Sequence, residues 1–127
     1  MVKICLVFLG AGIGAVARYK LSGWIFHHTP DWRFPLGTFL VNVIGCAIAG
    51  ILAGLVVRQN LFSADLQLLL FTGLLGGFTT FSAFGVETIY LLQRGHLSEA
   101  LAYVSLSVFC GVAGVWIGIA LIPHARP

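Results

Sequence analysis

Four long apolar stretches dominate this sequence. They cover residues 4–26, 34–57, 66–92 and 100–122, and each is longer than the roughly 20 residues that an α-helix needs to cross the hydrocarbon core of a bilayer. The second and fourth stretches contain no charged residue, and the third contains only Glu87. We therefore predict an all-α integral membrane protein with four transmembrane helices, in which residues 1–127 form a single domain.

The scarcity of charge excludes several classes of protein. Only 9% of the 127 residues are charged and 59% are hydrophobic, whereas a water-soluble domain usually carries about 25% charged residues. The seven Lys and Arg residues form no cluster that would bind a phosphate backbone. Cysteines stand singly in three stretches, which matches neither a zinc site nor a disulfide framework. We expect membrane lipid around the chain, no nucleic-acid partner and no catalytic site.

Lysine and arginine residues are divided almost equally between the two ends of the predicted helices. Three lie on the N-terminal side and three on the other, or four if Arg18 is counted: Lys3, Arg58 and Arg126 against Lys20, Arg33 and Arg94. Because an excess of these residues marks the cytoplasmic side, either another signal sets the orientation or the chain inserts both ways. Subunits of opposite orientation can pair about a two-fold axis in the membrane plane. We favour this second alternative, an antiparallel dual-topology homodimer.

The third stretch contains a segment that is poorly suited to a continuous helix. Gly76 and Gly77 are followed closely by Thr79 and Thr80, and both residue types have low helix propensity. We expect a break in mid-membrane that frees backbone carbonyl groups, which is tolerated where protein or a bound ion satisfies them. Two such breaks beside a two-fold axis would offer converging oxygens to an alkali cation. A simple kink is the alternative.

Aromatic and hydroxyl residues follow the break at helical spacing. Phe81 and Phe84 are three residues apart and therefore share a helix face. Packing is the ordinary role of such a pair, but the electropositive edges of the rings can also contact a small anion. Tyr103 and Ser107 are four residues apart in the last stretch and would form a short hydroxyl track.

Three further polar residues lie inside the stretches, and each has two interpretations. The amide of Asn42 offers two N–H donors to a dehydrated anion, or it bonds one helix to another. Arg18 extends to the membrane interface, or it concentrates anions at a vestibule. Glu87 is costly in a membrane unless it is paired, and Arg18 or threonine residues are its candidate partners.

Several motifs, taken together, resemble the Fluc (CrcB) family of fluoride channels. In chain order they are GAVARY at residues 14–19, PLGTFLVNVIG at 35–45, TGLLGGFTTFSAF at 72–84, Glu87, and LQRG at 92–95. The resemblance covers nearly the whole chain. It implies a dual-topology dimer with two antiparallel fluoride pores and a structural Na⁺ ion, not transported, at the dimer centre.

The same resemblance implies roles for individual residues. Gly76 and Thr79 match the positions whose backbone carbonyls bind the sodium ion. The residues expected to line the fluoride pore are Asn42, Phe81, Phe84, Tyr103 and Ser107. The residues expected at the vestibule or in support of the pore are Arg18, Thr38, Thr80, Ser82 and Glu87. Three positions depart from the family pattern: Ala83 stands where many members have threonine, and Gly111 and Val115 replace hydroxyl residues found in some relatives.

The resulting hypothesis is passive export of fluoride across the cytoplasmic membrane, which reduces fluoride toxicity. A strongly hydrated anion needs several weak donors in place of its water, and it would be trapped by a fixed strong charge. Three rival functions are less consistent with the residues. A small multidrug transporter needs a glutamate in its first helix, which this chain lacks. A packing subunit of a larger complex does not need the helix break, and a membrane enzyme needs catalytic residues.

Overall fold

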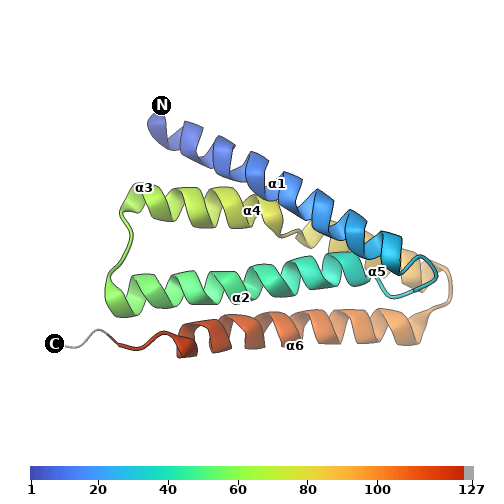
Figure 1. Ribbon diagram of the computed structural model, residues 1–127. Helices are drawn as coiled ribbons and strands as arrows, with labels where there is room; N and C mark the ends of the chain where they lie inside the picture. The colour runs from blue at the N-terminus through green and yellow to red at the C-terminus, as the bar shows by residue number, and fades with distance from the viewer. Residues whose placement is uncertain (125–127) are drawn as a thin grey trace.

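The computed structural model describes residues 1–124, which form helices and short connections and contain no strand (Figure 1). Three spans are continuous helices: α1 (Val2–His28), α2 (Leu36–Gln59) and α6 (Leu97–Leu121). The remaining span, Ala64–Gln93, consists of α3 (Ala64–Gln67), η1 (Leu68–Leu75), α4 (Gly76–Phe78) and α5 (Phe81–Gln93). All four spans are long and apolar enough to cross a membrane. The predicted four-helix membrane fold is confirmed, although Arg126, which entered the charge comparison, lies outside the described residues.

Local sequence explains where the spans begin and end. Pro35 precedes the first residue of α2, where the missing N–H of proline costs no helical hydrogen bond. Asn60 ends α2 in the left-handed conformation (φ 50°), which asparagine tolerates better than most residues. Gly95 (φ 77°) provides the turn between α5 and α6. Short connections of this kind make consecutive spans antiparallel.

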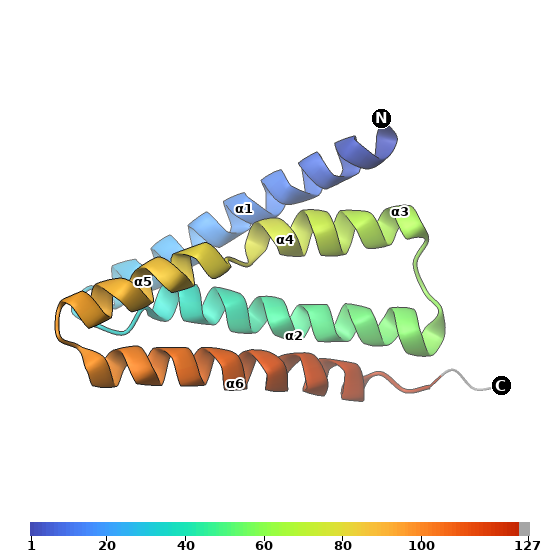
Figure 2. The same cartoon turned by 180° about the vertical axis from the view of Figure 1, so that it is seen from behind.

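The spans pack as two pairs. α2 lies alongside α6 over most of its length, and α1 crosses the third span at an angle and packs against η1 and α4 (Figures 1 and 2). Large apolar side chains such as Phe8, Trp24, Phe109 and Trp116 remain mostly exposed on the outside. An apolar exterior of this kind suits a lipid environment and would be insoluble in water, so the chain is a multi-pass membrane protein.

Glycine residues allow the backbones of α2 and α6 to approach closely. A Cβ atom added to Gly118 on α6 would lie 2.7 Å from the carbonyl oxygen of Ala47 and 2.7 Å from the nitrogen of Ile51, both on α2. Backbone atoms cannot yield as the end of a flexible side chain can. Small residues at such contacts provide the van der Waals packing that holds helices together in lipid.

We therefore expect Gly118→Ala to destabilise the protein by about 1–3 kcal/mol, the usual cost of overpacking. Thermal unfolding in detergent measures the effect as a lower midpoint temperature. Gly12→Ala is the matched control, because a Cβ at Gly12 meets no atom within 4 Å. Equal unfolding temperatures for the two variants would show that the α2–α6 contact leaves room for a Cβ atom at residue 118.

The third span is broken at Thr79 and Thr80, as predicted. Both residues have extended backbone, with φ −83° and ψ 157° at the first and φ −150° and ψ 117° at the second. The preceding Gly76 and Gly77 remain helical within α4. A Cβ on Gly77 would collide with the backbone of Ala11 on α1. The glycine pair therefore serves close packing against α1, and the break lies at the threonine pair.

The π-helical segment η1 before the break was not predicted. In a π-helix each N–H bonds to the carbonyl five residues back, and such turns often occur near functional sites. η1 packs against α1, where a Cβ on Gly73 would lie 3.0 Å from the Cα of Gly10. The wide turns of η1 thus occur where two backbones are in direct contact.

Candidate functional site

The side chain of Asn42 on α2 forms two hydrogen bonds with the helix break. Asn42 Nδ2 donates to the carbonyl oxygen of Thr80 at 2.9 Å, and the Thr80 N–H donates to Asn42 Oδ1 at 2.8 Å. The Thr80 N–H, which has no helical acceptor at the break, therefore has a partner, as a membrane interior requires. The Thr80 carbonyl belongs to the N-cap of α5 and accepts the first hydrogen bond of that helix, so Asn42 is an additional donor to it. One of the two N–H donors of Asn42 is used in this way, so one remains for a ligand. This pairing was not predicted from the sequence.

The backbone oxygen of Gly76 loses its helical partner at the break. In a continuous α-helix the Thr80 N–H would donate to the Gly76 carbonyl, but it donates to Asn42 instead. The hydroxyl of Thr79 is turned back into α4 and η1, where Oγ1 donates to the Leu75 carbonyl at 2.9 Å. The one donor of the Thr79 hydroxyl is therefore used within the third span.

A cavity of about 290 Å³ beside the break, here called the aromatic cavity, brings together four of the five residues predicted to line the pore. Its lining comprises Asn42, Phe81, Phe84 and Ser107 together with Cys46, Thr79, Thr80 and Val108. The two phenyl rings have centroids 5.5 Å apart and planes tilted by 39°. Ser107 Oγ is buried without a hydrogen-bond partner, which is unusual for a polar atom and calls for a polar ligand or water.

The fifth predicted pore residue, Tyr103, lies elsewhere. Its side chain is fully buried, and its hydroxyl donates to Glu87 Oε2 at 2.6 Å. Its ring contacts those of Phe84 and Phe34, with centroid distances of 5.1 and 5.3 Å. The structure therefore does not place the Tyr103 hydroxyl beside Ser107, and the short track predicted from their spacing is divided between two environments.

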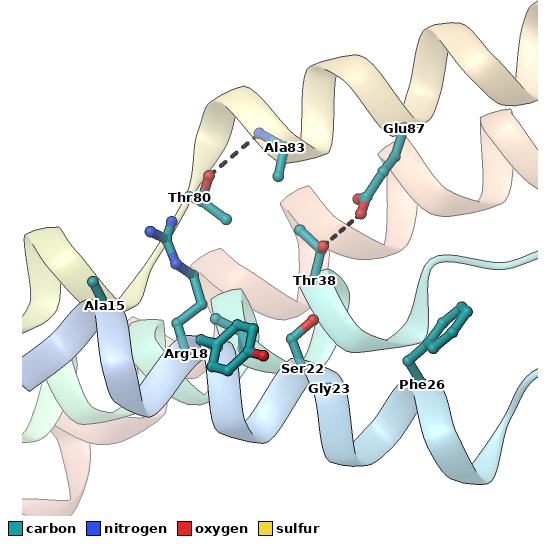
Figure 3. A pocket seen from close by; sticks show the side chains of 11 residues that line it. Ala15, Arg18, Ser22, Gly23, Phe26, Thr38, Thr80, Ala83 and Glu87 are labelled. Carbon is teal, nitrogen blue, oxygen red and sulfur yellow. Dashed lines mark hydrogen bonds between the residues drawn. The ribbon is translucent and has the colours of Figure 1, made fainter.

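Glu87 is paired, as its place in the membrane requires. Thr38 Oγ1 donates to Oε1 at 2.7 Å (Figure 3). The hydroxyl of Tyr103 donates to Oε2. The threonine partner agrees with the sequence prediction. No ion pair joins Glu87 to Arg18 within residues 1–124, because the guanidinium group of Arg18 extends toward Thr80 and away from Glu87 (Figure 3). The tyrosine partner was missed.

A second and larger cavity, here called the vestibule cavity, is lined by four of the five predicted supporting residues. It has a volume of about 530 Å³, and Arg18, Ser22, Thr38, Thr80 and Glu87 are among its lining residues (Figure 3). The guanidinium group of Arg18 extends toward the end of the cavity at Thr80, whereas Glu87 and Thr38 lie together at the other end (Figure 3). Thr80 lines both cavities, so they adjoin at the helix break.

The last predicted supporting residue, Ser82, is exposed. Its hydroxyl lies 3.3 Å from Thr80 Oγ1, and Thr80 Oγ1 accepts the N–H of Ala83 at 3.3 Å and so caps α5. Ser82 therefore lies next to the cap and lines neither of the two cavities.

These features define a small multi-pass membrane protein in which polar groups gather on both sides of a broken helix. The chain belongs to the CrcB family: the family model described as "CrcB-like protein, Camphor Resistance (CrcB)" matches residues 5–119. The family resemblance found in the sequence is thereby confirmed.

Individual relatives agree along nearly the whole chain. A protein of Methylobacillus flagellatus named fluoride-specific ion channel FluC is 50% identical, and the match covers 96% of this chain and 95% of the relative. A protein of Rhizobium etli with the same name is 43% identical, and the match covers 96% of this chain and 97% of the relative. A third, from Flavobacterium psychrophilum, is 42% identical over 94% of this chain and 95% of the relative. The family consists of membrane channels, and the chain is not an enzyme.

Proposed function

We propose that this protein is a fluoride-selective channel through which fluoride leaves the cell passively across the cytoplasmic membrane. The observation that carries the proposal is the aromatic cavity. In a chain 50% identical to a protein named for fluoride, it combines a spare amide N–H, an unpaired hydroxyl and two phenyl rings. All of these groups are weak donors, and none carries a charge.

Weak donors suit the conduction of fluoride. The ion is small and strongly hydrated, so a pore must replace its water by several contacts, each weak enough to release it. Asn42 and Ser107 can donate hydrogen bonds, and the electropositive ring edges of Phe81 and Phe84 can add contacts. In the vestibule cavity, Arg18 raises the local concentration of anions. The Glu87 carboxylate accepts hydrogen bonds from Thr38 and Tyr103.

Efflux from liposomes tests the proposal directly. Vesicles with purified protein are loaded with potassium fluoride or potassium chloride, and a potassium ionophore is added while ion-selective electrodes record release. We expect rapid release of fluoride and chloride release no faster than from protein-free vesicles. Release of both anions would overturn the proposed selectivity. Release of neither would overturn the channel itself and favour a packing subunit.

The active form in this proposal is an antiparallel homodimer with two pores. Around the break, Gly76, Phe81 and Ser82 are exposed in the single chain, and Phe81 retains 83% of its accessible surface. An inverted second copy would cover this region, and the even distribution of positive charge permits both orientations. Reporters fused to the C-terminus should then read out on both sides of the membrane, and a one-sided result would exclude dual topology.

A structural Na⁺ ion at the dimer centre completes the proposal. The Gly76 carbonyl lacks its helical donor, and Thr79 presents a carbonyl in extended backbone. Two copies would supply four hard oxygen atoms, which suit an alkali cation. This ion would be held and not transported.

Replacing sodium by N-methylglucamine throughout purification is expected to lower fluoride efflux by about tenfold or more and to weaken the dimer. The reason is that four carbonyl dipoles would converge without a cation between them. Thr79→Ser is the matched control in sodium. It keeps the backbone and the hydroxyl that bonds to Leu75, so its efflux should equal that of the unsubstituted protein. Equal efflux with and without sodium would contradict the proposed ion.

A further inference from the structure

The hydroxyl of Ser107 has no counterpart one turn further along α6. Ser107 is followed, at the next helical repeat, by Gly111, which has no side chain and is buried. A Cβ added to Gly111 would meet Cys46 Sγ of α2 at 3.4 Å and no other atom of the neighbouring helices within 4 Å. The thiol of Cys46 thus lies where a side chain at residue 111 would project.

Cys46 also belongs to the aromatic cavity. It follows Asn42 by one helical turn on α2, and both residues line the cavity with Phe81, Phe84 and Ser107. The thiol is free. Ser107 lines the same cavity, and its Oγ is buried without a hydrogen-bond partner among residues 1–124. The wall of the cavity therefore includes a residue with an unsatisfied polar atom, which calls for a polar ligand or water, and Cys46 belongs to the same wall.

We propose that the Cys46 thiol is a further lining group of the ion pathway, and that it donates weakly to the passing anion in place of the hydroxyl that α6 does not provide at Gly111. A thiol is a weak hydrogen-bond donor, in keeping with the other uncharged donors of the cavity. This inference rests on the proposed function, because it names one more group that contacts fluoride.

Substitution of Cys46 in the liposome efflux assay tests the inference. Cys46→Ala is expected to lower fluoride efflux about threefold to tenfold, the effect of losing one hydrogen-bond donor. Cys46→Ser keeps a donor and should keep the efflux. Cys5→Ala and Cys110→Ala are controls, since neither residue lines the aromatic cavity. Unchanged efflux in Cys46→Ala would overturn the inference.

A second pair of variants separates a donor from a packing group. In the Cys46→Ala background, Gly111→Ser returns a hydroxyl from α6, whereas Gly111→Ala returns similar bulk without a donor. We expect the serine to restore efflux and the alanine not to do so. Restoration of efflux by both variants would assign Cys46 a packing role, and restoration by neither would show that a donor does not replace the thiol. Either result would overturn the inference. Thermal unfolding of the two double variants identifies one that is misfolded. Absence of fluoride efflux from the unsubstituted protein would instead overturn the proposed function itself.

Discussion

Replacing Phe81 by isoleucine is expected to abolish fluoride efflux while leaving the dimer intact. Isoleucine is close to phenylalanine in hydrophobicity, but it lacks the electropositive ring edge that can contact an anion. Phe81 retains 83% of its accessible surface in the single chain, although it lines the aromatic cavity. Its ring therefore contributes little to packing within the chain. The measurement is fluoride efflux from liposomes, with the oligomeric state determined by size-exclusion chromatography.

A matched control for this substitution is Phe109→Ile. Phe109 lies on α6, retains 71% of its accessible surface and lines neither cavity, so its replacement should leave efflux and dimerisation unchanged. If Phe81→Ile conducts fluoride as fast as Phe109→Ile, the ring edge has no part in conduction. If Phe81→Ile is monomeric, the ring acts at the interface between subunits.

Replacing Asn42 by alanine is expected to reduce both efflux and stability. The change leaves the Thr80 N–H without a partner and removes one donor from the Thr80 carbonyl, and an unsatisfied buried N–H costs about 1–3 kcal/mol. The same change removes the spare N–H donor from the aromatic cavity. We expect a lower unfolding temperature in detergent and a loss of fluoride efflux of about 100-fold or more, since the shape of the break and a pore donor are lost together.

The comparison for Asn42 is Ser107→Ala. Ser107 lines the same cavity, and its Oγ makes no hydrogen bond within residues 1–124, so its removal should lower efflux without lowering the unfolding temperature. An Asn42→Ala protein that unfolds at the temperature of the unsubstituted protein would show that the bond pair between Asn42 and Thr80 does not stabilise the break.

Hydropathy predicted the spans well because the bilayer imposes the length of each apolar stretch. The interruption at Thr79 and Thr80 was predicted for a similar reason, since low helix propensity is a local property of the chain. η1 was not predicted. Gly73 within it contacts Gly10, a residue of another span, and no pattern within residues 68–75 indicates that contact.

Within the candidate site, the residues were easier to predict than their partners. Tyr103 and Ser107 share a helix face, yet the tyrosine hydroxyl bonds to Glu87. Long side chains on a helix lean toward its N-terminus, so the ring carries the hydroxyl about a turn away from Ser107. The pairing of Asn42 with Thr80 likewise depends on how α2 packs against the third span. An amide in mid-membrane that faces two consecutive β-branched residues is the signal that could have indicated it.

The bond pair between Asn42 and Thr80 also bears on the order of assembly. Both partners belong to one chain, so this bond pair can hold the bend in the third span before a second subunit is met. In the proposed dimer, a newly inserted subunit of either orientation would then carry the bend already. The rate of assembly of that proposed dimer should depend on how many subunits of each orientation the membrane contains.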